Sequence, residues 1–251
     1  MKKAKYGVDA PLVPLSYSIC TIALFLLGIV MVSIGYKWAY NFFGYGFFCF
    51  VFLSIYMHTT LKGKYQIWNN ILSELNLNQS SYFLDLGCGR GAIFYLIIKK
   101  LGKSVRGTGI DLWRKVDQSG NDLSIAEENA EIEGVNNQVE LITGDIRKLP
   151  FKDNSFDFVT SNLAIHNIKL KSDREKALKE AYRVLKSGGK LIIADISKVK
   201  EYKNIVEDLG MVNVTLKNAG WQGWWSGPWV STYILIATKS NIEVKAKSIN
   251  R

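Results

Sequence analysis

A glycine-rich run in the first half of the chain combines residue types that can hold a ligand. The sequence FLDLGCGRG, residues 83–91, joins an apolar strand pattern to an apolar helix pattern. Gly87, Gly89 and Gly91 let the backbone bend tightly and approach a ligand closely, because a Cβ at these points would block both. Asp85 lies two residues before the first glycine, where its carboxylate can reach a ligand ammonium over the turn. No Lys-Ser/Thr pair follows to mark a phosphate loop, so the run favours a cofactor that carries an amino acid.

One histidine lies where proton transfer could occur. His166 is part of SNLAIHNI, residues 161–168, which follows a β-rich run. Ligands of open α/β sheets bind at the carboxyl ends of the strands, and an imidazole there can act as a general base. A candidate base must also reach the proton that it removes, so packing or covering of a cofactor remain alternative roles for His166.

Alternating strand and helix patterns surround these residues. Strands are expected at residues 82–86, 107–111, 139–143, 156–161 and 191–195, and a last pair at 212–217 and 232–238. Helices fit between them at residues 92–101, 122–133 and 173–185, after an amphipathic helix at 65–77. The alternation predicts an α/β fold with a seven-stranded, mostly parallel sheet, helices on both faces and an antiparallel hairpin at the edge. We expect the first of these helices to pack on the domain.

The order and spacing of these motifs resemble those of class I methyltransferases that use S-adenosyl-L-methionine, in particular the group of the ubiquinone and menaquinone methyltransferases with its type 11 methyltransferase domain. The resemblance covers about the last three quarters of the chain and implies the Rossmann-like fold of that class. It also implies that residues 85–91, including Cys88, hold the methionine part of the cofactor. Asp111, next to Leu112, matches the acid that accepts hydrogen bonds from the ribose hydroxyls.

Two later segments extend the resemblance. In TGDIRKLPFKDNSFDFV, residues 143–159, Asp145 and Ile146 match positions that contact the adenine. Asn162, after the fourth strand, is also expected at the cofactor, and RVLKSGGKLIIAD, residues 183–195, resembles the helix, turn and strand that follow in the family. The adenine segment distinguishes this resemblance from a dinucleotide-binding protein, which would share the glycine turn and the acid after the second strand.

Two polar or aromatic segments have more than one interpretation. LWRKVDQSGND, residues 112–122, is a longer insertion than the family usually carries, and it either folds over the cofactor or forms a solvent loop that caps a helix. GWQGWWSGPW, residues 220–229, could line an acceptor pocket, hold a cationic amine, shield a sulfonium, enter a membrane interface or simply pack as a long loop. Its four indoles are candidate acceptor contacts: Trp221, Trp224, Trp225 and Trp229.

The first sixty residues are apolar in two blocks. Residues 10–36 carry no charge, and residues 38–61 are again uncharged after Lys37. Each block is long enough for the roughly 20 residues that a spanning helix needs. A cleaved signal peptide would have a shorter apolar region, and a hairpin buried in a soluble core would not be apolar throughout. We therefore expect a membrane anchor over residues 1–61, with transmembrane helices at about 15–36 and 38–60.

The charges predict the orientation and the partners. Three lysines precede the first block, and Lys62 and Lys64 follow the second, so both termini and the catalytic domain, residues 62–240, are expected on the cytoplasmic side of the membrane. The net charge is +10, and the basic tail, residues 241–251, suits an anionic lipid surface better than a nucleic acid. The three cysteines have no paired spacing for disulfides or zinc, so no metal is expected.

These patterns lead to one principal hypothesis and several alternatives. The principal one is a membrane-anchored S-adenosyl-L-methionine-dependent methyltransferase that methylates a small hydrophobic or lipid-like acceptor at an O, N, S or C atom. A thiol acceptor would need little help from a base, whereas a phenol, enol or protonated amine would need His166 or an equivalent. The alternatives are a non-catalytic membrane scaffold that binds the cofactor and a nucleotide-dependent oxidoreductase. Self-association through the hairpin is compatible with each.

Overall fold

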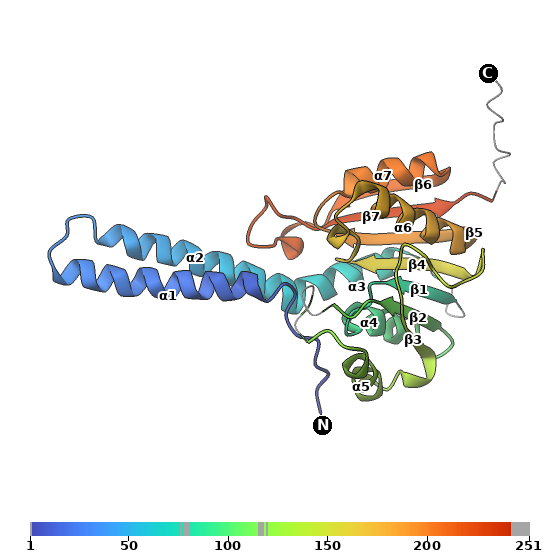
Figure 1. Cartoon of the computed structure of the whole chain (residues 1–251), viewed down its shortest axis with the longest axis horizontal. Coiled ribbons are helices and arrows are strands. Elements are labelled where there is room, and N and C mark those ends of the chain that lie inside the picture. Colours follow the sequence, from blue (N-terminus) through green and yellow to red (C-terminus); the bar gives the residue numbers. More distant parts are fainter. Residues whose placement is uncertain (1, 76, 78–80, 115–117, 119, 242–251) are drawn as a thin grey trace, which may run out of the picture.

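The structure consists of an α/β domain and a long helical hairpin that projects from it (Figure 1). This computed structural model describes residues 2–75, 77, 81–114, 118 and 120–241. Two sequence predictions lie wholly or partly outside these residues: the basic tail beyond residue 241, and the part of the polar insertion at residues 115–117 and 119.

Seven strands form one sheet, as the sequence predicts. In chain order they are β1 (Tyr82–Leu86), β2 (Arg106–Asp111), β3 (Val139–Thr143), β4 (Phe156–Asn162), β5 (Leu185–Asp195), β6 (Met211–Asn218) and β7 (Tyr233–Lys239). Their order across the sheet is β3-β2-β1-β4-β5-β7-β6, and β1 to β5 run parallel. β7 pairs antiparallel with both β5 and β6, so the last two strands close the sheet with β6 at its edge.

Helices cover both faces of the sheet. One face carries α3 (Lys64–Glu74), α4 (Ala92–Leu101) and α5 (Leu123–Glu133), and the other carries α6 (Lys171–Val184) and α7 (Val199–Asp208). Successive residues of β1 serve the two sides, because Phe83 packs with α3 and α4 whereas Leu84 packs with α6 and α7. Buried Trp68 and Ile71 on α3 confirm that the amphipathic helix packs on the domain.

Two elements differ from the sequence predictions. The helix α7 was not predicted, although Val199, Tyr202 and Val206 are buried at helical spacing. β5 begins at Leu185 rather than at residue 191, because Leu185 already pairs with Phe156 before a register shift in the ladder. Both differences lie beside the predicted elements and leave the order of the sheet unchanged.

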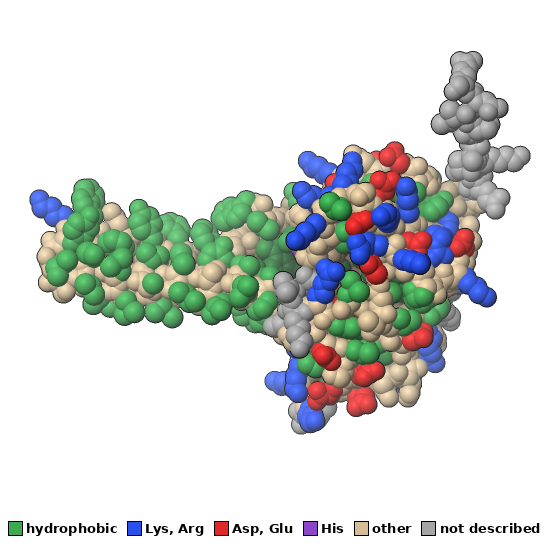
Figure 2. All heavy atoms as spheres, in the orientation of Figure 1, with side chains coloured by type: hydrophobic (Ala, Val, Ile, Leu, Met, Phe, Trp, Pro, Cys, Tyr) green, Lys and Arg blue, Asp and Glu red, His purple; other side chains and the backbone are tan. Residues whose placement is uncertain are grey.

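The hairpin consists of α1 (Leu12–Ser33) and α2 (Tyr40–His58), close to the two predicted apolar spans. Its helices approach closely, because a Cβ on Gly28 would lie 2.9 Å from the ring of Phe43 and one on Gly46 would lie 2.8 Å from the ring of Phe25. Hydrophobic side chains are spread over the whole visible length of the hairpin, whereas charged side chains gather on the domain (Figure 2). Two helices, Leu12–Ser33 and the continuous Tyr40–Glu74, are long and apolar enough to cross a membrane.

A π-helical turn, η1 (Thr59–Gly63), connects α2 directly to α3 without a loop. Single π-turns inside α-helices often mark functional sites, because they displace side chains from the regular helical positions. Here Thr59, Thr60 and Gly63 of the turn are buried. The hairpin therefore enters the domain as part of a helix that packs against the sheet.

Candidate active site

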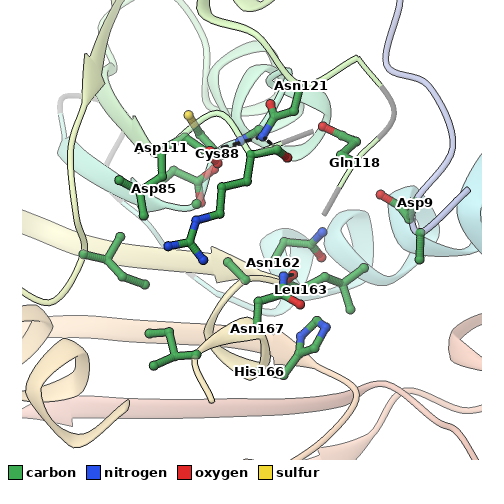
Figure 3. A pocket seen from close by; sticks show the side chains of 18 of the residues that line it. Asp9, Asp85, Cys88, Asp111, Gln118, Asn121, Asn162, Leu163, His166 and Asn167 are labelled. Atoms are coloured by element: carbon green, nitrogen blue, oxygen red, sulfur yellow. Dashed lines mark hydrogen bonds between the residues drawn. The ribbon is translucent and has the colours of Figure 1, made fainter. Parts of the chain in front are cut away.

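A cavity of about 620 Å³ opens at the carboxyl ends of β1, β2 and β4. The strand order reverses between β1 and β4, which is the place where open α/β sheets bind ligands. The glycine turn after β1 lies on one side of the cavity and the segment after β4 on the other (Figure 3). The volume falls within the range of small-molecule and cofactor sites, about 300–1,000 Å³.

The three glycines of the turn all adopt left-handed backbone conformations, but they have different roles. Gly87 has φ +73°, and an added Cβ would lie 2.3 Å from Cβ of Ala164, across the cavity wall. Gly89 has φ +52° and lines the cavity, as do Gly87 and Cys88. Gly91 has φ +85° and begins α4, away from the cavity lining, where a Cβ would meet the Tyr95 ring at 2.1 Å. Its role is to shape the turn.

Asp85 is a buried carboxylate at the end of β1. It lines the cavity with 2% of its surface exposed, and the Thr160 hydroxyl donates a hydrogen bond of 2.6 Å to it. Burial raises the pKa of Asp85 to about 7, the Thr160 hydrogen bond opposes the rise, and the nearby Asp111 carboxylate adds to it. A cationic ligand group would stabilise the ionised form, so this position is prepared for an ammonium.

Asp111 and Leu112 also line the cavity, at the end of β2. One Asp111 oxygen accepts the Gly89 backbone N–H at 2.9 Å, and the other accepts the Trp113 N–H at 2.6 Å and the Asn121 side-chain amide at 3.2 Å. The carboxylate thus fixes the glycine turn against the start of the polar insertion. Oδ1 thus has two donors, whereas Oδ2 has one and keeps a lone pair with which it could accept a ligand hydroxyl.

Asp145 and Ile146 lie on the cavity after β3. The Arg147 guanidinium donates to both Asp145 oxygens, at 2.6 to 3.0 Å, and this contact holds the pKa of Asp145 below its usual range. Arg147 also donates to Asp173, at the start of α6. Asp145 is therefore already paired, which the sequence did not indicate.

Asn162 is held by the helix that continues the hairpin. The Trp68 indole N–H on α3 donates to the Asn162 side-chain oxygen at 2.8 Å. The side chain of Asn162 lies at the cavity, beside the segment that carries Leu163, His166 and Asn167 (Figure 3). The amide nitrogen is left for a ligand, and the orientation of the amide depends on α3.

His166 lines the cavity from a short 3₁₀ turn, η3 (Ile165–Asn167). Its Nδ1 lies 2.5 Å from Oδ1 of Asp195, a fully buried carboxylate at the end of β5. Asp195 also accepts the backbone N–H of His166 at 3.1 Å and that of Ile196 at 2.8 Å. With Nδ1 against this carboxylate, Nε2 is the nitrogen left to face a ligand. Asp195 was not among the predicted site residues, although its place at the end of a strand next to β4 was a usable signal.

The base of the hairpin forms the remaining wall of the cavity, which the sequence did not predict. Five residues from three distant segments line it there: Asp9, Ala10, Tyr56, Lys64 and Trp225.

The tryptophan loop, residues 219–232 between β6 and β7, joins this wall. Trp225 is buried, and its ring packs edge-on against Tyr56 at 5.2 Å between centroids. The other three indoles lie outside the cavity lining. Trp221 stacks on His58, Trp229 packs edge-on against Phe52 of α2, and the Trp224 carbonyl accepts the Thr59 hydroxyl. The geometry brings one of the four predicted tryptophans to the cavity and places the others against the hairpin.

The loop and the hairpin touch through their backbones. A Cβ on Gly63 would lie 2.0 Å from the Gln222 carbonyl oxygen, so only glycine fits at this point of η1. The N-terminal segment completes the enclosure: the Lys5 backbone N–H donates to Asn129 and the Tyr6 hydroxyl to Glu133, both on α5. Segments from both ends of the chain thus close the hairpin side of the cavity.

Comparisons with known proteins agree with this geometry. Residues 84–193 match a family described as a methyltransferase domain. The chloroplastic 2-phytyl-1,4-beta-naphthoquinone methyltransferase of Arabidopsis thaliana is 34% identical over 139 residues, which cover 54% of this chain and 50% of that protein. A sterol 4-C-methyltransferase of Caenorhabditis elegans is 32% identical over 133 residues, covering 53% of this chain and 36% of that protein. The chain thus spans half or less of the length of these curated relatives.

A solved structure extends the similarity to the fold. A SAM-dependent methyltransferase from Aquifex aeolicus superposes with a TM-score of 0.54 at 24% identity, over 68% of this chain and 88% of that one. The region of sequence similarity begins in β1 and ends in β5, and it contains the glycine turn, the Asp145 segment and His166. Residues 84–193 therefore match a methyltransferase domain, and the chain has the class I methyltransferase fold.

Proposed function

We propose that the chain is a membrane-anchored methyltransferase that uses S-adenosyl-L-methionine and methylates a small hydrophobic or lipid-like acceptor. The observation that carries the proposal is one cavity that extends from the glycine turn to the base of an exposed apolar hairpin. A water-soluble cofactor and an apolar acceptor would meet in such a cavity from opposite directions.

The residues of the glycine turn fit this cofactor. Gly87 and Gly89 line the cavity in left-handed conformations that would place the backbone of the turn against the methionine part, and Asp85 offers its carboxylate to the ammonium. Asp111 keeps acceptor capacity for ribose hydroxyls, and Ile146 provides an apolar surface for the adenine. Bound there, the cofactor would supply an electrophilic methyl group on its sulfonium.

His166 is the proposed base. Asp195 lies against Nδ1, so Nε2 is the nitrogen that would accept a proton from an acceptor hydroxyl, enol or ammonium. An acceptor that enters as a thiolate would bypass this step, so small thiols form the second class of acceptor to test.

The hairpin is the proposed anchor. The 22 residues of α1 extend about 33 Å at 1.5 Å per residue, which matches a hydrocarbon core of about 30 Å. Only 6% of its most apolar stretch is buried, so α1 does not behave as the core helix of a soluble protein. The turn between α1 and α2 carries one charge, Lys37, whereas the domain end of the hairpin carries four lysines: Lys2, Lys3, Lys5 and Lys62. This difference supports a cytoplasmic domain with both termini on the same side.

The printed names of the relatives support an apolar ring as the acceptor. One is named for a naphthoquinone and another for a sterol, and both compounds contain apolar rings. Trp225 and Tyr56, at the hairpin end of the cavity, provide aromatic surface for a molecule of this kind. The acceptor would reach them directly from the membrane.

Calorimetry with the full chain in detergent micelles tests the cofactor, and radiolabelled methyl transfer tests the reaction. We expect micromolar binding of S-adenosylhomocysteine, about 8 kcal/mol, that is weakened at least tenfold in Asp85→Asn. Long-chain phenol, amine and thiol acceptors are then offered with labelled cofactor to the wild type and to Asp195→Asn. Transfer to any acceptor excludes the scaffold, whereas binding without transfer to all three favours it. Preference for NAD over S-adenosylhomocysteine would refute the cofactor assignment.

A further inference from the structure

A buried ammonium lies in the wall of the cavity at the π-helical turn. The Lys64 side chain is 4% exposed, and its Nζ lies 2.7 Å from Oδ2 of Asp9, in the N-terminal segment. The Thr60 hydroxyl donates to the same oxygen at 2.6 Å, and the Tyr56 hydroxyl donates to the Asp9 backbone carbonyl at 2.7 Å. The cluster is therefore fixed by the helix and by the N-terminal segment together.

The ammonium has unused hydrogen-bonding capacity. A lysine ammonium carries three donors. Within the described part of the chain, Lys64 makes one hydrogen bond, to Asp9, and one weaker contact with the Tyr65 ring at 5.6 Å. The same oxygen of Asp9 also accepts the Thr60 hydroxyl, so Lys64 shares its one carboxylate partner with a second donor. Buried charges are stable when further hydrogen bonds complete their surroundings, and Lys64 lines the cavity where a ligand could supply them.

We propose that Lys64 is a binding residue for an oxygen anion of a ligand in this cavity. The proposal rests on the proposed function and adds to it the chemistry of a second subsite. Ala10, Tyr56 and Trp225 line the same cavity as Lys64 and add apolar surface to it, so we assign the oxygen to a ligand with an apolar part. Two ligands carry such an oxygen: the acceptor, as a phenolate or enolate, and the cofactor, as the carboxylate of its methionine part.

The position of Lys64 also gives the subsite a consequence for the hairpin. Lys64 is the first residue of α3, directly after η1, and Asp9 lies three positions before the first residue of α1. The pair that would hold the ligand oxygen therefore joins the two segments by which the hairpin is connected to the domain. Binding of the ligand would tighten the contact between the N-terminal segment and the π-turn.

Equilibrium binding with the full chain in phosphatidylcholine nanodiscs tests the proposal. The variants are Lys64→Met, which keeps the length and removes the charge, and Asp9→Asn/Lys64→Met, which removes both charges and leaves no buried carboxylate alone. Lys64→Arg keeps a cation, and Lys62→Met removes an exposed lysine of the same turn as a matched control. Circular dichroism and gel filtration establish that each variant is folded.

The probes separate the two sources of the oxygen. Nonylphenol is compared with its methyl ether, and S-adenosylhomocysteine with methylthioadenosine, which lacks the amino-acid part. We expect both Met variants to lose about tenfold or more in affinity for nonylphenol or for S-adenosylhomocysteine, with the matched uncharged probe within twofold of wild type. Loss for nonylphenol alone assigns the acceptor, and loss for S-adenosylhomocysteine alone assigns the cofactor. Lys64→Arg and Lys62→Met should keep the wild-type preference.

Two results would overturn the subsite. The first is wild-type affinity of both Met variants for all four probes, and the second is an equal loss for each charged probe and its uncharged partner. If the wild type itself fails to bind S-adenosylhomocysteine, the failure belongs to the proposed function and not to the subsite. Phosphatidylglycerol added to the nanodiscs provides one more comparison. If this lipid competes with nonylphenol for the wild type but not for Lys64→Met, the subsite belongs to a lipid headgroup, and a ligand inside the cavity is refuted.

Discussion

The ionisation of Asp85 should make cofactor binding strongly dependent on pH. Burial raises the pKa of Asp85 to about 7 in the free protein. An ammonium in the cavity stabilises the carboxylate, so the pKa falls when S-adenosylhomocysteine binds. The free protein is therefore mostly ionised at pH 8 and mostly protonated at pH 6, and binding at pH 6 must first remove the proton. We expect the affinity to fall about tenfold from pH 8 to pH 6, or about 1.4 kcal/mol.

Calorimetry in buffers with different ionisation enthalpies measures both the affinity and the protons released. Binding at pH 6 should release about 0.9 proton, and binding at pH 8 about 0.1, if the pKa of the free carboxyl is near 7. Asp85→Asn has the same shape and no charge, so its weaker affinity should not change over this range. A wild-type affinity that is constant from pH 6 to 8 would refute the reasoning, as would an equal pH dependence in Asp85→Asn.

Three further changes test other parts of the structure. Asp85→Asn should stabilise the cofactor-free protein at pH 8 and not at pH 4, because the folded pKa of about 7 exceeds the usual 3.8 by about three units. Each unit costs the wild type about 1.4 kcal/mol of folding stability once the pH has risen through that window. Thermal unfolding at pH 8 should therefore show a free energy of unfolding up to about 4 kcal/mol higher in the variant. His166→Gln should lower kcat for a phenol acceptor by about 10² to 10⁴ in a methyl-transfer assay, with S-adenosylhomocysteine affinity unchanged, and equal turnover would exclude the base. Gly63→Ala should push the Gln222 carbonyl away from η1 and expose the tryptophan loop to limited proteolysis. Gly44→Ala, whose added Cβ would have nothing within 4 Å, should leave the cleavage unchanged. Identical cleavage in the two variants would argue against a tight contact between η1 and the tryptophan loop.

The sequence predicted those parts of the fold that depend on short-range patterns. β1 and β3 have the predicted bounds, because each is a short apolar run between polar turns. The helix α7 was missed, although Val199, Tyr202 and Val206 follow helical spacing, because the same stretch contains five charged residues and starts from Lys198 in a left-handed conformation. The charged residues between them obscure the helical spacing of the three buried side chains.

The sequence predicted residues that line the cavity on the side of the glycine turn, but on the hairpin side it predicted only Trp225. Asp85 and Asp111 end neighbouring parallel strands, so their proximity follows from the topology. The contact between Asp9 and Lys64 joins residues 55 positions apart on either side of the two apolar helices. No local pattern predicts that contact, because it depends on how the hairpin enters the domain. The pairing of Asp145 with Arg147 depends on side-chain orientation, which residue spacing does not specify.

The continuous helix from Tyr40 to Glu74 has a mechanical consequence. Helices tilt when their apolar length and the local bilayer thickness differ. A flexible linker would not pass such a tilt on to the domain. Here η1 and α3 would transmit it to Trp68, whose indole orients Asn162 at the cavity. For an anchored enzyme, turnover would then vary with the acyl chain length of the surrounding lipid. Turnover would then depend on bilayer thickness and would be highest where the bilayer leaves this helix untilted.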